Sequence, residues 1–260
     1  MELTHDFRQR TALLLGDERM ARLQNARVAV FGLGGVGGAC AEALCRAGVG
    51  RLTLVDNDTV SLSNINRQIV ALHSTVGQPK TAALRARLLD INPACDIEEK
   101  NLFFDQSTAD SIDFSAFDYV IDAIDTVSAK LLLVERARAA GTPILCCMGT
   151  GNKLDPTSLR ISAIEKTSVC PLCRVMRREL RARGIAGVRV LWSDESPCVP
   201  IQQLSENGRH PPGSVSFVPP VAGMILAGQV VRELAGLAGG YPAAGRKPCP
   251  FAVFVSNLTI

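Results

Sequence analysis

The chain has 260 residues, of which 47% are hydrophobic and 20% charged, and its formal net charge is +3. This length suits one large domain or two closely packed ones, with enough apolar material for a sizeable core. A charge of +3 is too small to indicate nucleic-acid binding by itself, although it is compatible with a local basic patch. The nine cysteines do not indicate a disulfide framework, because a core of this size needs no covalent staples.

Neither end of the chain carries an obvious targeting segment. Residues 2–6 are mostly polar and lack the apolar stretch of a signal peptide. The longest apolar run, 215–235, contains two prolines, Arg232 and Glu233, which makes it a poor membrane span. We therefore expect a cytoplasmic protein without membrane attachment.

Strand and helix patterns alternate through the first half. Short apolar runs ending in glycine or an acid are typical of buried parallel strands, and strands separated by helices form parallel sheets with right-handed crossovers. Residues 27–150 are thus predicted to form a Rossmann-like nucleotide-binding core after a helical arm over 1–26. The predicted strands are 27–32, 51–56, 119–122 and 144–147, and the predicted helices are 36–47, 79–91 and 127–140.

The second half is less regular, and we expect residues 151–260 to extend the sheet as a mixed part that serves the substrate or a dimer contact. An alternating run predicts a strand at 159–164, with an antiparallel direction as one option. The fold class is therefore α/β, a mostly parallel sheet with helices on both faces. Further predictions are helices at 172–183 and 221–234, a polar loop at 205–213 and a closing strand at 251–255.

A glycine-rich loop follows the first predicted strand. Gly32, Gly34, Gly35 and Gly37 match GxGxxG, which allows a tight turn, close approach of backbone to phosphate and close helix packing. Asp56 ends the next strand about 20 residues on, where a carboxylate accepts hydrogen bonds from a ribose. The loop indicates a nucleotide, but these residues do not distinguish NAD from ATP.

Charged residues further along favour ATP. The pyrophosphate of NAD is held largely by backbone amides, whereas a triphosphate needs cations and a metal. Arg67 and Lys80 follow the second strand, and Asp122 ends the strand 119–122, with Asp125 a short turn later. A carboxylate at that edge suits Mg²⁺, which takes few protein ligands and completes its shell with phosphate and water. The competing interpretations are a solvated lysine at the start of a helix and an aspartate that caps one.

Four motifs together resemble the activation domain shared by ubiquitin-activating enzymes and the bacterial ThiF and MoeB proteins: GLGGVG at 32–37, DNDTVSLSNINRQ at 56–68, GQPK at 77–80 and DAID at 122–125. The resemblance covers most of residues 10–150 and implies an ATP-dependent enzyme that adenylates a carboxylate, usually as a homodimer. It implies that Asp56 holds the ribose, that Asn66, Arg67 and Lys80 contact the phosphates, that Asp122 holds Mg²⁺ bound with ATP, and that Arg10 is inserted from the partner subunit.

Segments of the second half, with residues 6–16, resemble the tRNA threonylcarbamoyladenosine dehydratase branch of this superfamily; they are 152–157, 166–169, 174–183 and 214–231. This resemblance implies that ATP adenylates the threonyl carboxylate on the modified adenosine beside the anticodon. The side chain then closes onto its activated carbonyl, with release of AMP and net dehydration, and the tethered attack has a high effective molarity. Some relatives bind a monovalent cation or work with a cysteine desulfurase system.

A tRNA substrate also gives a role to five arginines within ten positions, which could contact phosphates along one side of a helix. The competing interpretation is a solvated helix face. The five are Arg174, Arg177, Arg178, Arg181 and Arg183.

The cysteines do not indicate a zinc site. Cys170 and Cys173 form one CxxC pair, but the second pair is missing, because Cys198 and Cys249 stand alone. We favour cysteines that act as small hydrophobic residues. Ring closure needs no nucleophilic cysteine, and Cys170 is the candidate if one exists.

Three other functions remain as alternatives. An activator of a sulfur-carrier protein ending in Gly-Gly would share the first-half motifs. A non-catalytic adaptor of a cysteine desulfurase would bind ATP without turnover. An NAD-dependent oxidoreductase would leave Arg67, Lys80 and Asp122 without a role.

Overall fold

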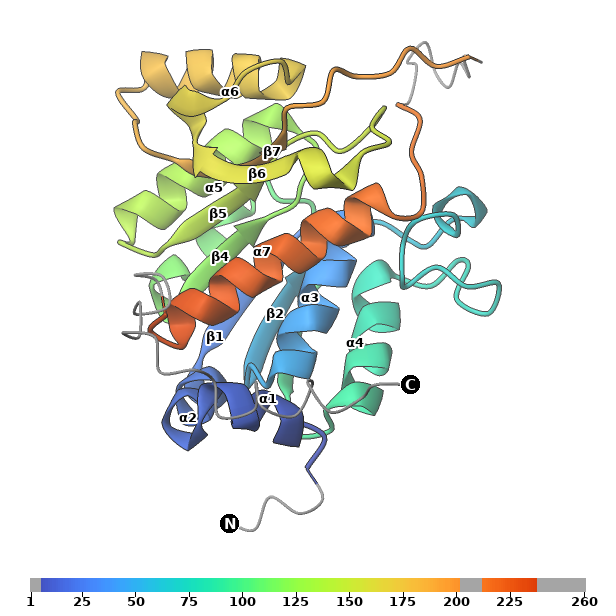
Figure 1. Ribbon diagram of the computed structural model, residues 1–260, viewed down its shortest axis with the longest axis vertical. Helices are drawn as coiled ribbons and strands as arrows, with labels where there is room; N and C mark the ends of the chain where they lie inside the picture. Colours follow the sequence, from blue (N-terminus) through green and yellow to red (C-terminus); the bar gives the residue numbers. More distant parts are fainter. Residues whose placement is uncertain (1–5, 202–211, 238–260) are drawn as a thin grey trace, which may run out of the picture.

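The computed structural model describes residues 6–201 and 212–237. A seven-stranded sheet in the order β3-β2-β1-β4-β5-β7-β6 carries helices on both faces (Figure 1). All neighbouring strands are parallel except β6, which runs antiparallel to β7. The predicted mostly parallel α/β sheet with a mixed C-terminal extension is therefore confirmed. The strands are β1 (Arg27–Phe31), β2 (Arg51–Val55), β3 (Asp96–Lys100), β4 (Tyr119–Asp122), β5 (Ile144–Cys147), β6 (Leu159–Ala163) and β7 (Arg189–Ser193).

The helices begin and end close to the predicted positions. Helix α7 starts earlier than expected and includes two prolines in its first turn. Proline lacks a backbone N–H, but N–H groups in the first turn have no acceptor within the helix, so no hydrogen bond is lost there. The helices are α1 (Gln9–Leu15), α2 (Asp17–Asn25), α3 (Gly35–Ala47), α4 (Lys80–Ile91), α5 (Val127–Ala139), α6 (Pro171–Ala182) and α7 (Val218–Leu234).

The strand order reverses beside β1, which pairs with β2 on one side and β4 on the other. In open parallel sheets, such a reversal leaves a crevice outside the carboxyl ends of the strands, where ligands bind. The loops after β1, β2, β4 and β5 all lie at this edge, so the topology brings the sequence motifs together.

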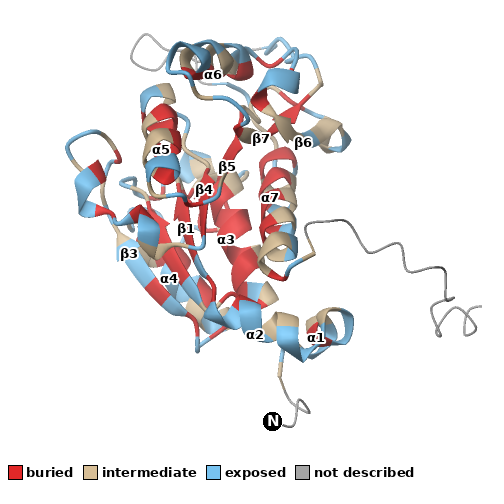
Figure 2. Cartoon of the chain, turned by 90° about the vertical axis from the view of Figure 1, so that its left-hand side faces the viewer, coloured by how far each residue is buried: buried red, intermediate tan, exposed pale blue. Residues whose placement is uncertain are grey.

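Two apolar layers fix the sheet between its helices. Helices α3, α4 and α7 pack against one face through residues such as Leu44, Leu84 and Leu226. Helix α5 packs against the other face, where Phe31 stacks on Phe114 with ring centroids 5.8 Å apart. The central strands and the inner sides of α3 and α7 are accordingly buried (Figure 2). Burial of both faces explains why β1 and β4 are continuous apolar runs.

Two strands were missing from the prediction. β3 has the sequence DIEEK, whose only fully buried residue is Ile97, so it carries no apolar pattern. It exists because its backbone pairs with β2 at the sheet edge. β7 is buried over Val190–Ser193 and joins β5 to β6, but its run is too short to distinguish from a loop in sequence.

Some expectations fall elsewhere. The predicted closing strand at 251–255, most of the polar loop at 205–213 and Cys249 lie outside the described residues. Among residues 6–201 and 212–237, no helix combines the length and apolar character that crossing a bilayer requires.

Candidate nucleotide-binding site

A cleft of about 790 Å³ opens at the carboxyl edge of the sheet. Its walls come from the glycine loop, the loops after β2, β4 and β5, and the start of α7. Of the predicted residues, the cleft is lined by Gly32, Gly34, Gly35, Asp56, Arg67 and Lys80.

The glycine loop is shaped by close backbone contacts. Gly32 has φ +85°, and a Cβ there would lie 2.6 Å from the carbonyl oxygen of Ala123. A Cβ on Gly37 would lie 1.7 Å from the carbonyl oxygen of Gly32, so Gly37 closes the turn against β1 and does not line the cleft. The amino terminus of α3 therefore faces the cleft, and its first N–H groups suit an anion such as phosphate.

Asp56 connects the glycine loop to the loop after β2. The backbone N–H of Leu33 donates to one carboxylate oxygen at 2.6 Å, and that of Asp58 donates to the other at 2.8 Å. These bonds orient the carboxylate at the cleft wall, as expected of a group that holds a ribose.

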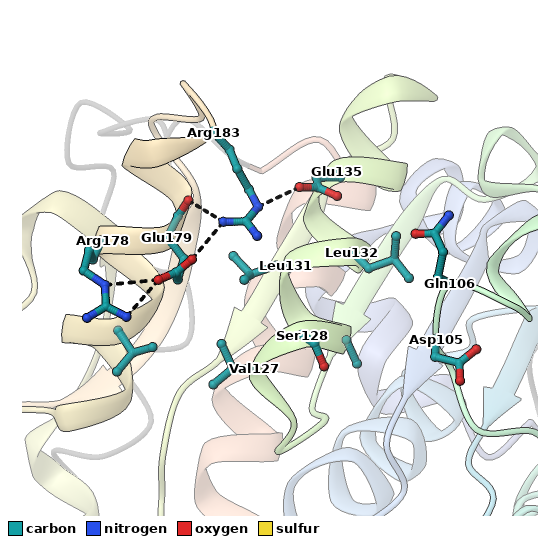
Figure 3. Close-up of a pocket in the computed structure, with 12 residues that line it drawn as sticks. Asp105, Gln106, Val127, Ser128, Leu131, Leu132, Glu135, Arg178, Glu179 and Arg183 are labelled. Carbon is teal, nitrogen blue, oxygen red and sulfur yellow. Dashed lines mark hydrogen bonds and ion pairs between the residues drawn. The ribbon is translucent and has the colours of Figure 1, made fainter.

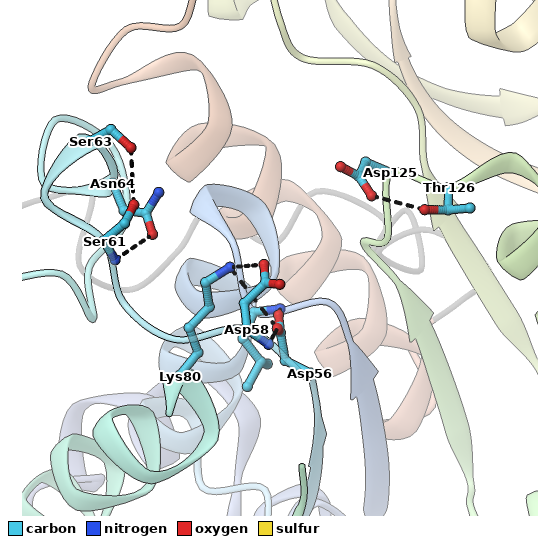
Figure 4. Close-up of polar contacts among 9 residues, drawn as sticks. Asp56, Asp58, Ser61, Ser63, Asn64, Lys80, Asp125 and Thr126 are labelled. Carbon is cyan, nitrogen blue, oxygen red and sulfur yellow. Dashed lines mark hydrogen bonds and ion pairs between the residues drawn. The ribbon is translucent and has the colours of Figure 1, made fainter. Parts of the chain in front are cut away.

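Lys80, the first residue of α4, is held by two carboxylates. Its Nζ lies 2.6 Å from Asp58 and 4.0 Å from Asp56 (Figure 4). The Lys80 side chain is only 6% exposed, so its charge is confined to the cleft. A bound phosphate would compete with Asp58 for the ammonium group.

Arg67 and Asn66 occupy different places. Arg67 lines the cleft, and its guanidinium donates to the carbonyl oxygen of Ser63 and to Asn66 Oδ1 at 3.0 and 2.9 Å. Asn66 donates to the carbonyl oxygen of Ser214 at 3.0 Å and does not line the cleft. In this conformation Asn66 links the rim segments and orients Arg67, so the prediction of a direct phosphate contact is not supported by its position.

The predicted metal ligand needs a correction. Asp122 and Lys130 are both 0% exposed, and Lys130 Nζ lies 2.8 Å from Asp122 Oδ2. Burial alone would lower the pKa of Lys130, but the Asp122 carboxylate raises it above its ordinary value, so the lysine stays charged. Asp122 is therefore sealed behind the cleft wall as half of a buried ion pair. Asp125, three residues later, is exposed and lines the cleft.

Gln68 also lines the cleft, although sequence analysis gave it no role. Its side chain is buried, and its amide oxygen has no hydrogen-bond donor among the described residues. A buried acceptor without a partner is uncommon and suits a ligand group that donates, such as a hydroxyl. The only sequence signal was its place directly after Arg67.

Arg10 lies far from this cleft within its own chain. It is exposed on α1, which leads through α2 into the amino end of β1. The neighbouring Arg8 packs against Gly48, at the carboxyl end of α3. Helix α3 is 13 residues long, so its two ends are separated by about 18 Å.

Comparison with known proteins identifies the family. The sequence matches the ThiF family over residues 8–255. This chain belongs to the ThiF family.

Among ThiF-family relatives, the chain is 43% identical to the tRNA threonylcarbamoyladenosine dehydratase of Bacillus subtilis, over 89% of this chain and 95% of that one. It is 35% identical to the Escherichia coli protein of the same name, over 75% of this chain and 76% of that one. It also matches the Escherichia coli molybdopterin-synthase adenylyltransferase at 41% identity, but over only 47% of this chain and 49% of that one.

Solved structures give the same result. The structure of Escherichia coli tRNA threonylcarbamoyladenosine dehydratase with AMP superimposes with a TM-score of 0.81 at 30% identity, covering 92% of this chain and 99% of that chain. The structure of that protein with ATP superimposes with a TM-score of 0.79 over the same shares. The expected family and fold are thus confirmed.

The cysteines of this ThiF-family member have contrasting environments. Cys170 is the N-cap of α6, and the neighbouring Cys173 thiol lowers the pKa of Cys170 despite its burial. Burial raises the pKa of Cys146 and Cys147. Within the described ranges, no three His, Cys, Asp or Glu side chains cluster as metal ligands.

Proposed function

We propose that this protein is an ATP-dependent tRNA threonylcarbamoyladenosine dehydratase. The observation that supports this proposal is the extent of the match: the Bacillus subtilis dehydratase aligns over 89% of this chain, whereas the molybdopterin-synthase adenylyltransferase aligns over 47% of it. The segments beyond residue 150 build β6, β7 and α6, and they contribute Gly151 and Leu172 to the cleft lining.

The geometry supports adenylation. The amino terminus of α3, Arg67 and Lys80 present positive charge to the phosphates, and Asp56 faces the ribose. The substrate carboxylate attacks the α-phosphorus of ATP, and pyrophosphate leaves. A nucleophilic atom of the carbamoyl group then attacks the acyl carbon, an N–H proton is lost and AMP leaves, so that the nucleoside has lost one water overall. Holding the reactants in one cleft makes the second step intramolecular.

We assign the Mg²⁺-binding role to Asp125 in place of Asp122. Asp125 offers an exposed carboxylate in the cleft, and its Oδ1 accepts a hydrogen bond from the Thr126 hydroxyl at 3.3 Å. When bound, Mg²⁺ supplies positive charge to the phosphates. Asp122 instead fixes the turn that carries Asp125.

We also propose a cytoplasmic homodimer in which Arg10 of one subunit serves the cleft of the other. The distance of α1 from its own cleft supports this arrangement. Helix α1 also carries two exposed leucines, Leu13 and Leu14, whose side chains are 82% and 76% exposed and would be covered by a partner subunit.

The test measures AMP release from ATP and Mg²⁺, with and without tRNA carrying threonylcarbamoyladenosine, followed by mass analysis of the nucleoside. We expect AMP release that depends on this tRNA, together with loss of one water from the nucleoside. Arg67→Ala should abolish both. Arg85→Ala, on an exposed arginine of α4 outside the cleft, should leave both intact.

Two other outcomes would redirect the assignment. Pyrophosphate exchange that ignores tRNA but requires a Gly-Gly carrier protein would place the chain with the sulfur-carrier activators. ATP binding without turnover on either substrate would leave a nucleotide-binding adaptor.

A further inference from the structure

A second hollow, a groove of about 570 Å³, lies between α5 and α6. Leu131 and Leu132 of α5 line it with apolar side chains (Figure 3), and Val175 of α6 also contributes to the lining. The groove borders the nucleotide cleft: Phe104 and Thr126 line the cleft, and the next residues along the chain, Asp105 and Val127, line the groove. The groove is therefore the neighbouring hollow for a ligand that extends beyond one nucleotide in the cleft.

Positive charge lies on the exposed side of α6, the helix that forms one wall of this groove. Arg174, Arg178 and Arg181 follow the spacing i, i+4, i+7, which places them in one stripe about 10 Å long. All three are exposed, and Arg178 also lines the groove. Among the residues that the structure describes, neither Arg174 nor Arg181 has an ion-pair partner, so both are available to an anionic ligand.

The groove lining itself holds three carboxylates, Asp105, Glu135 and Glu179, and two of them orient arginines. Glu179 accepts two hydrogen bonds from Arg178, at 3.1 and 2.8 Å, and one from Arg183 Nη1 at 3.0 Å (Figure 3). Arg183 also donates to Glu135 of α5 at 2.9 Å. These bonds hold planar guanidinium groups at the groove wall, where a planar group stacks on a base as well as contacting a phosphate.

The combination fits single-stranded RNA. Such strands bind where a track of cations follows the backbone and apolar or planar groups contact the bases. We propose that the groove holds the tRNA strand next to the modified adenosine, with phosphates along the stripe of Arg174, Arg178 and Arg181 and a base on the apolar lining. This inference rests on the proposed function, because it assumes that the cleft receives an adenosine of tRNA.

Ser128 allows a direct test, because it is exposed in the first turn of α5 and lines the groove. Ser128→Glu places a negative charge in the groove, and an acid near a helix amino terminus does not destabilise the helix. Ser128→Gln has nearly the same size without the charge. We expect Ser128→Glu to raise the Kd for tRNA about tenfold relative to Ser128→Gln, with the Kd for ATP unchanged in both.

The salt dependence tests the arginines. Loss of three phosphate contacts should reduce the slope of log K against log[salt] by about 2, at about 0.7 per contact for a single strand. We expect this change in a variant with Arg174, Arg178 and Arg181 replaced by Gln. A control variant with Arg46, Arg51 and Arg85 replaced by Gln has the same charge but should keep the wild-type slope, because these residues lie away from α6.

The outcomes separate this inference from the proposed function. If the wild-type protein forms AMP with the modified tRNA, but Ser128→Glu and the triple variant bind tRNA like their controls, the groove proposal is wrong and the dehydratase proposal stands. If the variants lose tRNA binding as expected but the wild type forms no AMP, the groove binds RNA and the dehydratase proposal fails. Absence of tRNA binding by the wild type would overturn both.

Discussion

Lys80 is held in the cleft by neighbouring carboxylates, in a position where its ammonium group can bind a phosphate. Its ammonium group lies 2.6 Å from Asp58 and 4.0 Å from Asp56. The two carboxylates fix the lysine in an almost buried position. Phosphate must displace Asp58, whose side chain is 59% exposed and free to move into solvent.

Lys80→Met should remove this charge with little change in volume. We expect AMP formation to fall about 10²–10³-fold, the usual effect of losing a group that stabilises charge in a transition state. The measurement is the rate of AMP formation at saturating ATP. Lys100→Met, which removes a lysine of β3 paired with Glu98, is the control and should keep wild-type activity. Equal losses in both variants would contradict a specific role for Lys80.

Variants of Asp122 and Asp125 should have different effects: one should lower the stability of the protein, and the other should weaken Mg²⁺ binding. Asp125→Asn removes an exposed carboxylate, so we expect normal stability but a higher Mg²⁺ concentration for half-maximal ATP binding, measured by calorimetry. Asp122→Asn leaves the Lys130 ammonium buried without its partner, which typically costs about 3–5 kcal/mol.

Urea unfolding tests the second half of this prediction. If the Asp122→Asn protein is as stable as wild type but needs a different Mg²⁺ concentration, Asp122 is the Mg²⁺ ligand and the assignment to Asp125 is wrong.

The predicted site residues that line the cleft share a property. Asp56, Arg67 and Lys80 follow strands at the carboxyl edge, so topology alone brings them to the cleft. Sequence does not give the direction of a side chain at the end of a strand. Asp122 turns inward because it forms an ion pair with Lys130 near the start of α5. The sequence did not identify Lys130 as the partner of Asp122.

At the scale of elements, the closest helix contact is between α3 and α7. A Cβ on Gly223 of α7 would lie 2.3 Å from the carbonyl oxygen of Val36 and 2.9 Å from the Cβ of Ala39. Gly223 is thus explained by packing within one chain. This contact also positions Pro219 beside the glycine loop, because a Cβ on Gly35 would lie 2.9 Å from Pro219 Cβ.

Gly223→Ala should destabilise the protein by about 1–3 kcal/mol, because the added methyl group has no space. A Cβ on Gly228, further along the same helix, would meet no heavy atom of the described residues within 4 Å, so Gly228→Ala should be neutral or stabilise by up to about 1 kcal/mol. Thermal unfolding of both variants gives the comparison. A larger loss in Gly228→Ala than in Gly223→Ala would contradict the packing argument.

The strands that the sequence did not predict, β3 and β7, are stabilised by backbone pairing with neighbouring strands. β3 is hydrophilic and pairs with β2 through its backbone, and this backbone pairing cannot be recognised from the side-chain pattern. The antiparallel direction of β6 follows from its pairing with β7, an undetected strand, so sequence left that direction open.

At the scale of the molecule, a polar cluster joins three elements at the end of the sheet away from the cleft. Arg189 of β7 donates to Glu233 of α7, and the Tyr119 hydroxyl of β4 donates to the same carboxylate at 3.0 Å. Burial raises the pKa of Glu233, but the hydrogen bonds from Arg189 and Gln229 outweigh it, so the net pKa lies below the ordinary value.

The lowered pKa of Glu233 gives a pH dependence of stability. A group with a depressed pKa binds fewer protons in the folded state, so its stabilising effect is complete above its unfolded pKa of about 4.3 and is lost as the pH falls through the folded value. Glu233→Gln should therefore be less stable than wild type at neutral pH and should converge with it below about pH 4. Urea unfolding across this range checks the prediction, with the exposed Glu18→Gln as control. A constant difference between Glu233→Gln and wild type at all pH values would contradict it.

The position of Arg10 makes a prediction about assembly. Arg10 lies at the amino edge of the sheet and the cleft at the carboxyl edge, so one chain cannot bring them together while α3 separates them. If Arg10 acts in the cleft of a second subunit of a symmetric dimer, each active site combines residues of two chains. Arg10→Ala and Arg67→Ala should then both be inactive as homodimers.

Mixing these two inactive variants should restore activity. In a mixed dimer, one cleft carries both defects, whereas the other has an intact Arg67 and receives an intact Arg10 from its partner. Random exchange makes half of the dimers mixed, and half of their sites are intact, so about one quarter of wild-type AMP formation is expected. Subunits exchanged in mild denaturant and returned to buffer provide the mixture, with each variant treated alone as control. Failure to recover activity, while sedimentation shows that mixed dimers have formed, would mean that Arg10 does not act across the dimer.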